Sequence, residues 1–138
     1  MLTQLIYRSV ATLPFLCGDF VRLLEPTRQN NERKAISGLL LYHQGVFMQV
    51  LEGEPNAVGD VIERIRKDKR HRALEVLRNQ EIAKRDFGRW SMGFLAVDEL
   101  DAEMQPLEQV FDTGVDPGAL DLTRIIADLN RLKPFIEL

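Results

Sequence analysis

The apolar and polar positions of this chain predict strands with two helices between them. In the clearest segment, Ile36–Gly53, two apolar, β-prone runs are joined by His43-Gln44-Gly45, a pattern typical of an antiparallel hairpin. Leu2–Arg8 alternates moderately and predicts a first strand. Leu74–Lys84 and Arg89–Val97 predict a fourth and a fifth strand.

Helical spacing appears on both sides of the hairpin. Before it, one helix face is formed by Leu16, Phe20, Leu23 and Leu24. Pro26 should stop or kink this helix near Glu25, and the polar run Gln29–Lys34 is then expected to be a loop. After the hairpin, Glu54-Pro55 begins a second helix, because a proline is tolerated in the first turn.

The resulting order, β-α-β-β-α-β-β, predicts an α+β, ferredoxin-like fold with two helices on one face of the sheet. Two further amphipathic helices are expected at roughly Asp101–Phe111 and Pro117–Leu132. They should cover the other face of the sheet, or else form an oligomer interface. We therefore expect a domain over residues 1–97 and a C-terminal helical extension over residues 98–138. The apolar residues that favour this extension are Leu120, Ile125, Ile126, Leu129, Leu132, Phe135 and Ile136.

Composition excludes several classes of protein. The net charge of −3 offers no basic excess to neutralise phosphates, which argues against a nucleic-acid binder. One cysteine allows no internal disulfide, and two histidines are too few for a histidine-rich metal site, so we expect no metal. No apolar run is long enough for a membrane span, and the chain does not begin like a signal peptide, so the cytoplasm is the default location.

Gln49 does not fit the apolar strand that contains it. A buried amide has four hydrogen-bonding sites, and leaving them open costs stability. In the predicted topology Tyr7, on the first strand, is a neighbour of Gln49 on the helix-covered face. Either neighbouring side chains satisfy the amide or a bound polar ligand does. Glu52 and Glu54, by contrast, are expected in a solvated turn rather than as a catalytic pair.

Other polar residues are expected around the same cleft between the helices. Asn30 and Asn31 follow the predicted first helix, Arg64 lies on the second, and Asp68, Arg70 and His71 end it. Taken singly, Asn30-Asn31 suits a helix stop and Arg64 suits a surface charge. Together with Tyr7 and Gln49 they suit a planar heterocycle with carbonyl and ring-nitrogen groups. The spacing leaves both a structural and a ligand-binding role open.

The chain resembles the BLUF family, bacterial sensors of blue light using FAD, from Leu2 to about Phe94. The motifs that carry this resemblance are LIYRS (Leu5–Ser9), QNN (Gln29–Asn31), ISGLLLYHQGVFMQVLEG (Ile36–Gly53), DxRH (Asp68–His71) and RDFGRWSMGF (Arg85–Phe94). Ser37 stands where threonine is usual in the family. The fold implied by the resemblance is the ferredoxin-like one already predicted.

The resemblance implies a role for each residue of the cleft. Tyr7 is the photochemical electron donor, and Gln49 is the amide between Tyr7 and the flavin. Asn31 binds the C4=O/N3 edge of the flavin, with Asn30 as a further polar contact, and Arg64 lies at the C2=O side. The remaining residues of the implied FAD site are Leu23 and Ile65, which sandwich the ring, Phe47, Asp68, Arg70 and His71. Trp90 and Met92, both expected on the fifth strand, relay the signal, and either one could face the cleft.

The implied mechanism is a transfer of an electron and a proton from Tyr7, followed by their return, which leaves Gln49 rotated or tautomerised. A short chain of this kind is expected to be a photoreceptor rather than an enzyme. It would signal to a separate effector or regulator protein and form homo-oligomers. The alternatives are a flavin-dependent oxidoreductase, an acylphosphatase-like hydrolase that uses Arg64 and an asparagine, or a ligand-free interaction module.

Overall fold

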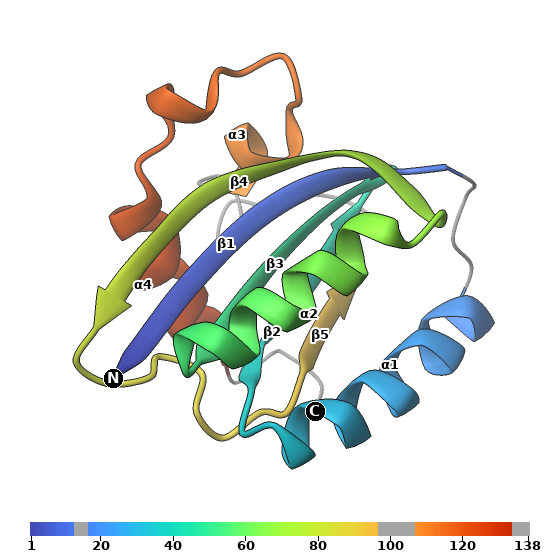
Figure 1. Cartoon of the computed structure of the whole chain (residues 1–138). Coiled ribbons are helices and arrows are strands. Elements are labelled where there is room, and N and C mark those ends of the chain that lie inside the picture. Colours follow the sequence, from blue (N-terminus) through green and yellow to red (C-terminus); the bar gives the residue numbers. More distant parts are fainter. Residues whose placement is uncertain (13–16, 97–106, 134–138) are drawn as a thin grey trace.

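A five-stranded sheet with helices on both faces forms the core of the protein (Figure 1). The computed structural model describes residues 1–12, 17–96 and 107–133. The strands are β1 (Leu2–Ala11), β2 (Ser37–His43), β3 (Val46–Gly53), β4 (His71–Ile82) and β5 (Gly93–Ala96). The helices are α1 (Cys17–Arg33), α2 (Pro55–Lys67), α3 (Glu108–Phe111), the short 3₁₀ helix η2 (Pro117–Ala119) and α4 (Leu122–Leu132).

The spatial order of the strands is β4-β1-β3-β2-β5. β1 pairs antiparallel with β3 and β4, β2 pairs antiparallel with β3, and β5 pairs parallel with β2. The predicted β-α-β-β-α-β-β order and α+β class are confirmed, and β1 and β3 are neighbours near the middle of the sheet. Gln44 and Gly45 connect β2 to β3 with φ values of 46° and 83°. Positive φ at both central residues is the signature of a type I′ hairpin turn.

Helix α1 is longer than the sequence pattern predicted. It continues through Pro26 to Arg33, so Asn30 and Asn31 lie within the helix and not in a loop after it. The chain leaves the helix at Ala35, whose φ is 54°, and the Ile36 amide donates to the Asn31 carbonyl at 2.8 Å. This is the hydrogen bond of a Schellman motif. The expected stop near Glu25 is therefore wrong, because the helix tolerates Pro26 and ends at a left-handed residue further on.

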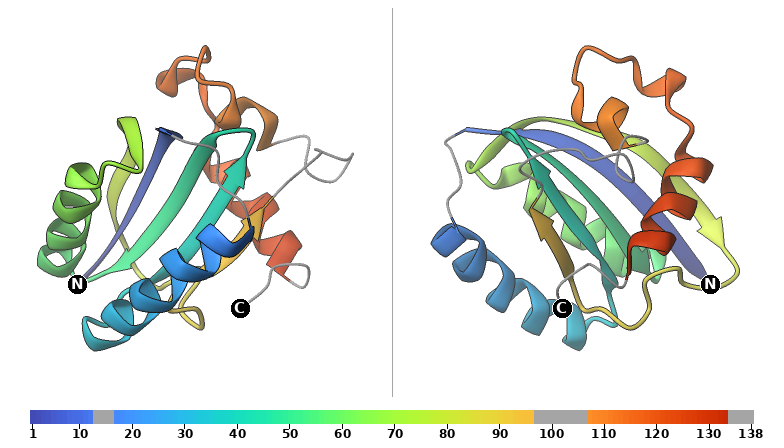
Figure 2. Two further views of the ribbon diagram at one scale, coloured as in Figure 1. Left: turned by 90° about the vertical axis from the view of Figure 1, so that its right-hand side faces the viewer. Right: turned by 180° about the vertical axis from the view of Figure 1, so that it is seen from behind.

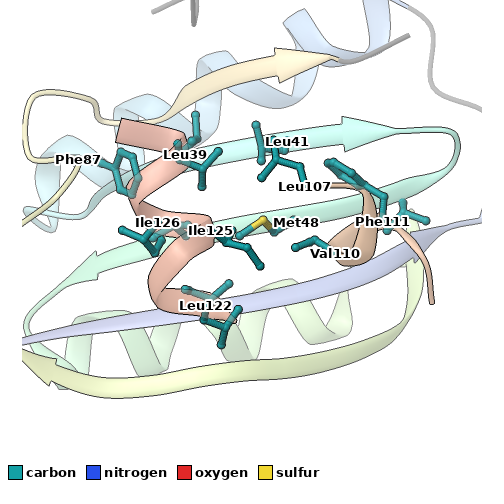
Figure 3. Packing of buried hydrophobic residues seen from close by; sticks show 14 of the residues in the cluster. Leu39, Leu41, Met48, Phe87, Leu107, Val110, Phe111, Leu122, Ile125 and Ile126 are labelled. Atoms are coloured by element: carbon teal, nitrogen blue, oxygen red, sulfur yellow. The ribbon is translucent and has the colours of Figure 1, made fainter. Parts of the chain in front are cut away.

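The two faces of the sheet carry separate apolar clusters. Leu5, Leu40, Leu51 and Ile62 belong to the inner cluster, and the views in Figures 1 and 2 place α1 and α2 on that face. The outer cluster includes Ile6, Leu39 and Met48 of the sheet, and its helical members come from α3 and α4 (Figure 3). Neighbouring strand residues such as Leu5 and Ile6 therefore pack into opposite clusters, as expected for strands that are buried on both faces.

The C-terminal helices cover the outer face, as one of the two expectations stated. Ile125, Ile126 and Leu129 of α4 are buried in the outer cluster. Residues 101–106 of the first predicted C-terminal helix, and the side chains of Leu132, Phe135 and Ile136, lie outside the described residues. The boundary between residues 97 and 98 stays a prediction. Among the described segments, no helix is long and apolar enough to cross a membrane.

The fifth strand is shorter than predicted. It covers only Gly93–Ala96, so Trp90 and Met92 lie in the segment before it. A Cβ atom on Gly93 would lie 2.6 Å from Cε3 of Trp90. The indole ring therefore packs over the start of the strand, and only a residue without a side chain fits beneath it.

Candidate functional site

A cavity of about 500 Å³ lies on the inner face of the sheet, lined by residues of α1, α2 and the strands beneath them. Its size is in the range typical of small-molecule sites. Eleven residues predicted to bind a cofactor all line it: Tyr7, Leu23, Asn30, Asn31, Phe47, Gln49, Arg64, Ile65, Asp68, Arg70 and His71. Leu23 comes from α1 and Ile65 from α2, so the cavity has an apolar side chain from each helix.

Tyr7 and Gln49 form the central polar pair of the cavity. They are directly opposite each other in the β1–β3 register, and each is only 4% exposed. The Tyr7 hydroxyl donates a hydrogen bond of 2.5 Å to Oε1 of Gln49. Burial, and secondarily the Asp68 carboxylate, raises the pKa of the Tyr7 phenol above its ordinary value. Tyr7 is therefore a protonated donor at neutral pH, and one of the acceptor sites of Gln49 is satisfied by the protein.

The other end of the Gln49 amide faces a sulfur atom. Nε2 of Gln49 donates to Sδ of Met92 at 3.3 Å. A thioether is a weak acceptor, so this end of the amide is held less firmly than the end that accepts from Tyr7. Gln49 thus lies between a strong partner and a weak one.

Met92 faces the cavity side of the sheet and Trp90 faces the opposite side. Met92 belongs to the inner apolar cluster, whereas Trp90 belongs to the outer one. Trp90 stacks against Phe87 with ring centroids 6.0 Å apart, and the ammonium of Lys133 lies 5.9 Å from its ring. Of the two residues, the structure therefore places Met92 on the cavity side of the sheet, beside Gln49, although it does not line the cavity itself.

The segment after α2 forms one end of the cavity. Nε of Arg70 donates to both carboxylate oxygens of Asp68, at 2.9 and 3.0 Å, and the Arg70 amide donates to Oδ1 at 2.9 Å. These bonds, the side-chain bond first, lower the pKa of Asp68. Nε2 of His71 lies 2.5 Å from the Ile65 carbonyl, but its buried Nδ1 has no hydrogen-bond partner among the described residues. His71, a cavity residue, therefore has one ring nitrogen that no described residue satisfies.

The remaining predicted polar residues contribute from the two helices. Asn31 is buried, and its Nδ2 donates to the Ser91 carbonyl at 2.6 Å. Asn30 is half-buried and Arg64 is exposed, and both side chains line the cavity. The Arg64 side chain makes no hydrogen bond or ion pair with any residue that the structure describes, so its guanidinium is available to a ligand.

Sequence reasoning missed part of the site. The cavity is also lined by Arg22, Leu24, Pro26, Thr27, Leu40, Leu51, Val61 and Lys67. Four of these lie on α1: Arg22 and Leu24 fall within the predicted helix, whereas helical spacing would have identified Thr27 if the helix had been extended through Pro26. Arg28, which donates to the Met92 carbonyl at 2.8 Å, was missed for the same reason.

Glu52 was predicted in a solvated turn, and that prediction is wrong. Its side chain is 0% exposed. The carboxylate accepts hydrogen bonds from the Phe87 amide at 2.7 Å, the Asp86 amide at 2.9 Å and Nε2 of Gln4 at 2.9 Å. Glu52 therefore fastens the segment between β4 and β5, which leads to Trp90 and Met92. Glu54 is exposed, as expected.

The residues present fit a flavin ring. A planar ring can lie between Leu23 and Ile65, with the amides of Asn30, Asn31 and Gln49 and the guanidinium of Arg64 available to its carbonyl and nitrogen groups. Nδ1 of His71, another residue of the cavity wall, is left without a partner among the described residues. No cluster of metal-ligating side chains occurs in the described part of the chain. Fold and cavity together define an α+β ligand-binding domain.

Comparisons with known proteins identify that domain. The BLUF family model, described as sensors of blue-light using FAD, matches residues 2–93. The beta subunit of photoactivated adenylate cyclase from Euglena gracilis is 33% identical over 110 residues, which are 79% of this chain and 13% of that protein. The solved structure described as the BlsA photo-activated state has a TM-score of 0.79 and 28% identity, covering 96% of this chain and 94% of that one. BlrB, a BLUF protein in its dark state, has a TM-score of 0.76 and 32% identity, covering 91% and 96%.

This chain belongs to the BLUF family, and the cofactor of that family is FAD. The family is one of light sensors, and the resemblance predicted from the motifs is confirmed. The match covers only a small part of the curated relatives, 13% of the length of the Euglena gracilis beta subunit.

Proposed function

We propose that this chain is a blue-light photoreceptor in which Tyr7 and Gln49 are the photochemical pair and FAD occupies the cavity between α1 and α2. The observation that carries the proposal is the hydrogen bond from the buried Tyr7 hydroxyl to Oε1 of Gln49 in the cavity wall. Leu23 and Ile65 sandwich the ring. Its polar edges are bound by Asn30, Asn31, Arg64, Asp68, Arg70 and His71, with Phe47 lining the site.

When bound, the flavin supplies an excited state that is a strong oxidant, and the protein supplies orientation and electrostatics. With the flavin bound, Tyr7 would give one electron to it, and the Tyr7 hydroxyl proton would move along the existing hydrogen bond to Oε1 of Gln49. Both return to Tyr7 afterwards, so the cycle has no net redox change. A phenol with its ordinary pKa of about 10 is already protonated at neutral pH, and burial raises that pKa further, so Tyr7 begins the cycle with a proton to give.

Gln49 is the residue that remains changed after the electron and the proton have returned to Tyr7. Its two amide ends are nearly equal in shape but opposite in hydrogen-bonding sense, so rotation or tautomerisation reverses what it offers to its neighbours. The weak contact of Nε2 with the Met92 sulfur, 3.3 Å long, costs little to exchange. One or two altered buried hydrogen bonds are worth on the order of 1–3 kcal/mol, which biases a two-state element roughly tenfold or more.

The signal passes from Gln49 to Met92 and then to Trp90 on the outer face, where α3 and α4 pack. We propose that these helices present it to a separate effector or regulator protein, that the chain has no catalytic activity of its own, and that it forms homo-oligomers. The family match favours this sensor function over a flavin-dependent oxidoreductase or an acylphosphatase-like enzyme.

Colour and illumination test the proposal. The purified protein should be yellow, and blue light should shift its flavin absorption band reversibly to the red. Tyr7→Phe should retain the flavin and abolish the shift, because the phenolic proton and the easily oxidised ring are both lost. The matched control is Tyr42→Phe, which changes the other tyrosine of the chain and should keep the shift. A full shift in Tyr7→Phe would contradict the proposed role of Tyr7.

A further inference from the structure

Three consecutive backbone carbonyls before β5 are each fixed by a donor from another element. The Trp90 carbonyl accepts from the Gly38 amide of β2 at 3.0 Å, and the Ser91 carbonyl accepts from Nδ2 of Asn31 at 2.6 Å. The Met92 carbonyl accepts from Nε of Arg28 at 2.8 Å. Two of the three donors are side chains of α1, so this helix holds the backbone that carries both Trp90 and Met92.

Arg28 differs from Asn31 in where it lies. Asn31 lines the cavity, whereas Arg28 does not. The Arg28 side chain is half-buried beside the segment before β5. Nε is the guanidinium nitrogen closest to the backbone, and its N–H lies in the plane of a rigid, permanently charged group. A bond from this atom therefore fixes the position of the Met92 carbonyl without any contact with the ligand cavity.

The Met92 carbonyl and the Met92 side chain belong to the same residue, so fixing one restricts the other. Sδ of Met92 accepts from Nε2 of Gln49 at 3.3 Å, a weak contact that cannot by itself hold a flexible side chain in place. On the other side of the backbone, Trp90 is only 8% exposed and packs with Phe87. A shift of the Met92 carbonyl would therefore displace side chains on both faces of the sheet, Met92 on the inner face and Trp90 on the outer one.

We propose that Arg28 is a positioning residue of the photochemical switch: its bond to the Met92 carbonyl holds Met92 toward Gln49 and Trp90 toward the outer helices. The inference rests on the proposed function, because it assigns Arg28 to the arrangement that Gln49 perturbs. It also means that α1 helps to hold the dark state of the switch, together with the segment before β5 that carries Trp90 and Met92. Arg28 acts through Met92 and does not contact the reacting atoms.

The test uses the flavin-bound full chain with Arg28→Gln, Arg28→Lys and the control Arg33→Gln. Arg33 ends the same helix and is exposed, and its side chain makes no hydrogen bond or ion pair with any described residue. Two quantities are measured. The first is the rate at which the red-shifted absorption band returns to its original position in the dark, and the second is the quenching of tryptophan fluorescence by acrylamide. Trp90 is the only tryptophan in the chain, so the fluorescence reports on its position alone.

Arg28→Gln should bind flavin as the wild type does, since Arg28 is not a cavity residue. Its dark recovery should slow by roughly three- to tenfold. The reason is that the dark state, to which the site returns, has lost one partly solvated hydrogen bond from a charged donor. Trp90 should become more accessible to acrylamide in the dark. Arg28→Lys, which keeps a cationic donor, should recover faster than Arg28→Gln, and Arg33→Gln should match the wild type.

Wild-type recovery and wild-type quenching in Arg28→Gln would overturn the assignment of Arg28 while leaving the proposed function intact. A change in thermal stability alone, with both readouts unchanged, would also overturn it, because a merely structural bond predicts that result. If the wild type itself shows no reversible red shift, the proposed function fails instead. The quenching experiment would then still report whether Arg28 holds Trp90 in place.

Discussion

The hydroxyl of Tyr7 and Oε1 of Gln49 are joined by a 2.5 Å hydrogen bond between directly opposed positions of β1 and β3. Residues opposite each other in an antiparallel pair have side chains on the same face and close together. Because both side chains are buried, the bond is little weakened by competition with water. The sheet register itself therefore brings the proposed donor and the proposed switch together, and the helices only close the site above them.

Burial of Tyr7 predicts how stability depends on pH. The pKa of the phenol is raised above its ordinary value of about 10 in the folded protein, chiefly by burial. Below pH 10 Tyr7 is protonated in both the folded and the unfolded state. Above pH 10 the unfolded state loses the proton first, so the free energy of unfolding should fall by up to about 1.4 kcal/mol per pH unit from this residue.

Denaturant unfolding of the wild type and Tyr7→Phe between pH 9 and 11 checks this prediction. The difference between their unfolding free energies should decrease as the pH rises, since phenylalanine cannot ionise. In Tyr42→Phe, the fall in the free energy of unfolding that is due to Tyr7 should persist. A difference between wild type and Tyr7→Phe that does not change with pH would show that Tyr7 is not held neutral by burial.

Glu52→Gln should destabilise the segment between β4 and β5. An amide in place of the carboxylate turns a donor toward one of the backbone amides of Asp86 and Phe87, which now donate to Glu52. The expected loss is about 1–3 kcal/mol of unfolding free energy, because a buried donor is left without an acceptor. Denaturant midpoints and amide hydrogen exchange at Phe87 measure it. Glu54→Gln, at an exposed position without a side-chain cap, should change neither; equal midpoints for the two variants would be evidence against the Glu52 account.

Arg8→Met should loosen the turn after α3. Arg8 is only 1% exposed, and its guanidinium donates to the carbonyls of Asp112 at 3.3 Å and Val115 at 2.5 Å. Glu75, the ionic partner 3.5 Å away, remains in contact with water when Arg8 is removed, so the cost comes mainly from the carbonyls. We expect a loss of about 1.5–3 kcal/mol, as for a hydrogen bond to a charged group. Amide exchange at residues 112–115 should speed up relative to β3, and unchanged exchange there would refute the role of Arg8.

The sheet and the polar pair of the cavity could be predicted from the sequence because short-range patterns determine them. Alternation identifies the strands, and the strand order of a β-α-β-β-α-β sheet makes β1 and β3 neighbours. Gln49 was conspicuous because an amide in an apolar strand needs a partner. The hydroxyl of Tyr7 and the sulfur of Met92 are the partners that the structure supplies.

Most of the remaining features depend on tertiary contacts that local patterns do not encode. Pro26 suggested a helix end, yet α1 continues because its end is determined by the Schellman bond at Ile36 and Asn31. Glu52 resembled a surface residue, but backbone amides from a distant segment satisfy its carboxylate. The arginine of LIYRS likewise gave no sign that it would be buried against carbonyls near residue 112. For Glu52 and Arg8 a long-range hydrogen bond overrides the local preference, whereas the end of α1 is determined by a local capping bond.

Gln49→Leu tests the central claim most directly. Leucine has a similar volume but no hydrogen-bonding groups. The flavin should therefore remain bound, while position 49 no longer has a donor and an acceptor to exchange. Absorption spectra in the dark and under blue light are compared with those of Gln80→Leu, the same substitution at an exposed position of β4. We predict a yellow protein without a reversible red shift in Gln49→Leu and a normal shift in Gln80→Leu. A wild-type red shift in Gln49→Leu would contradict the account.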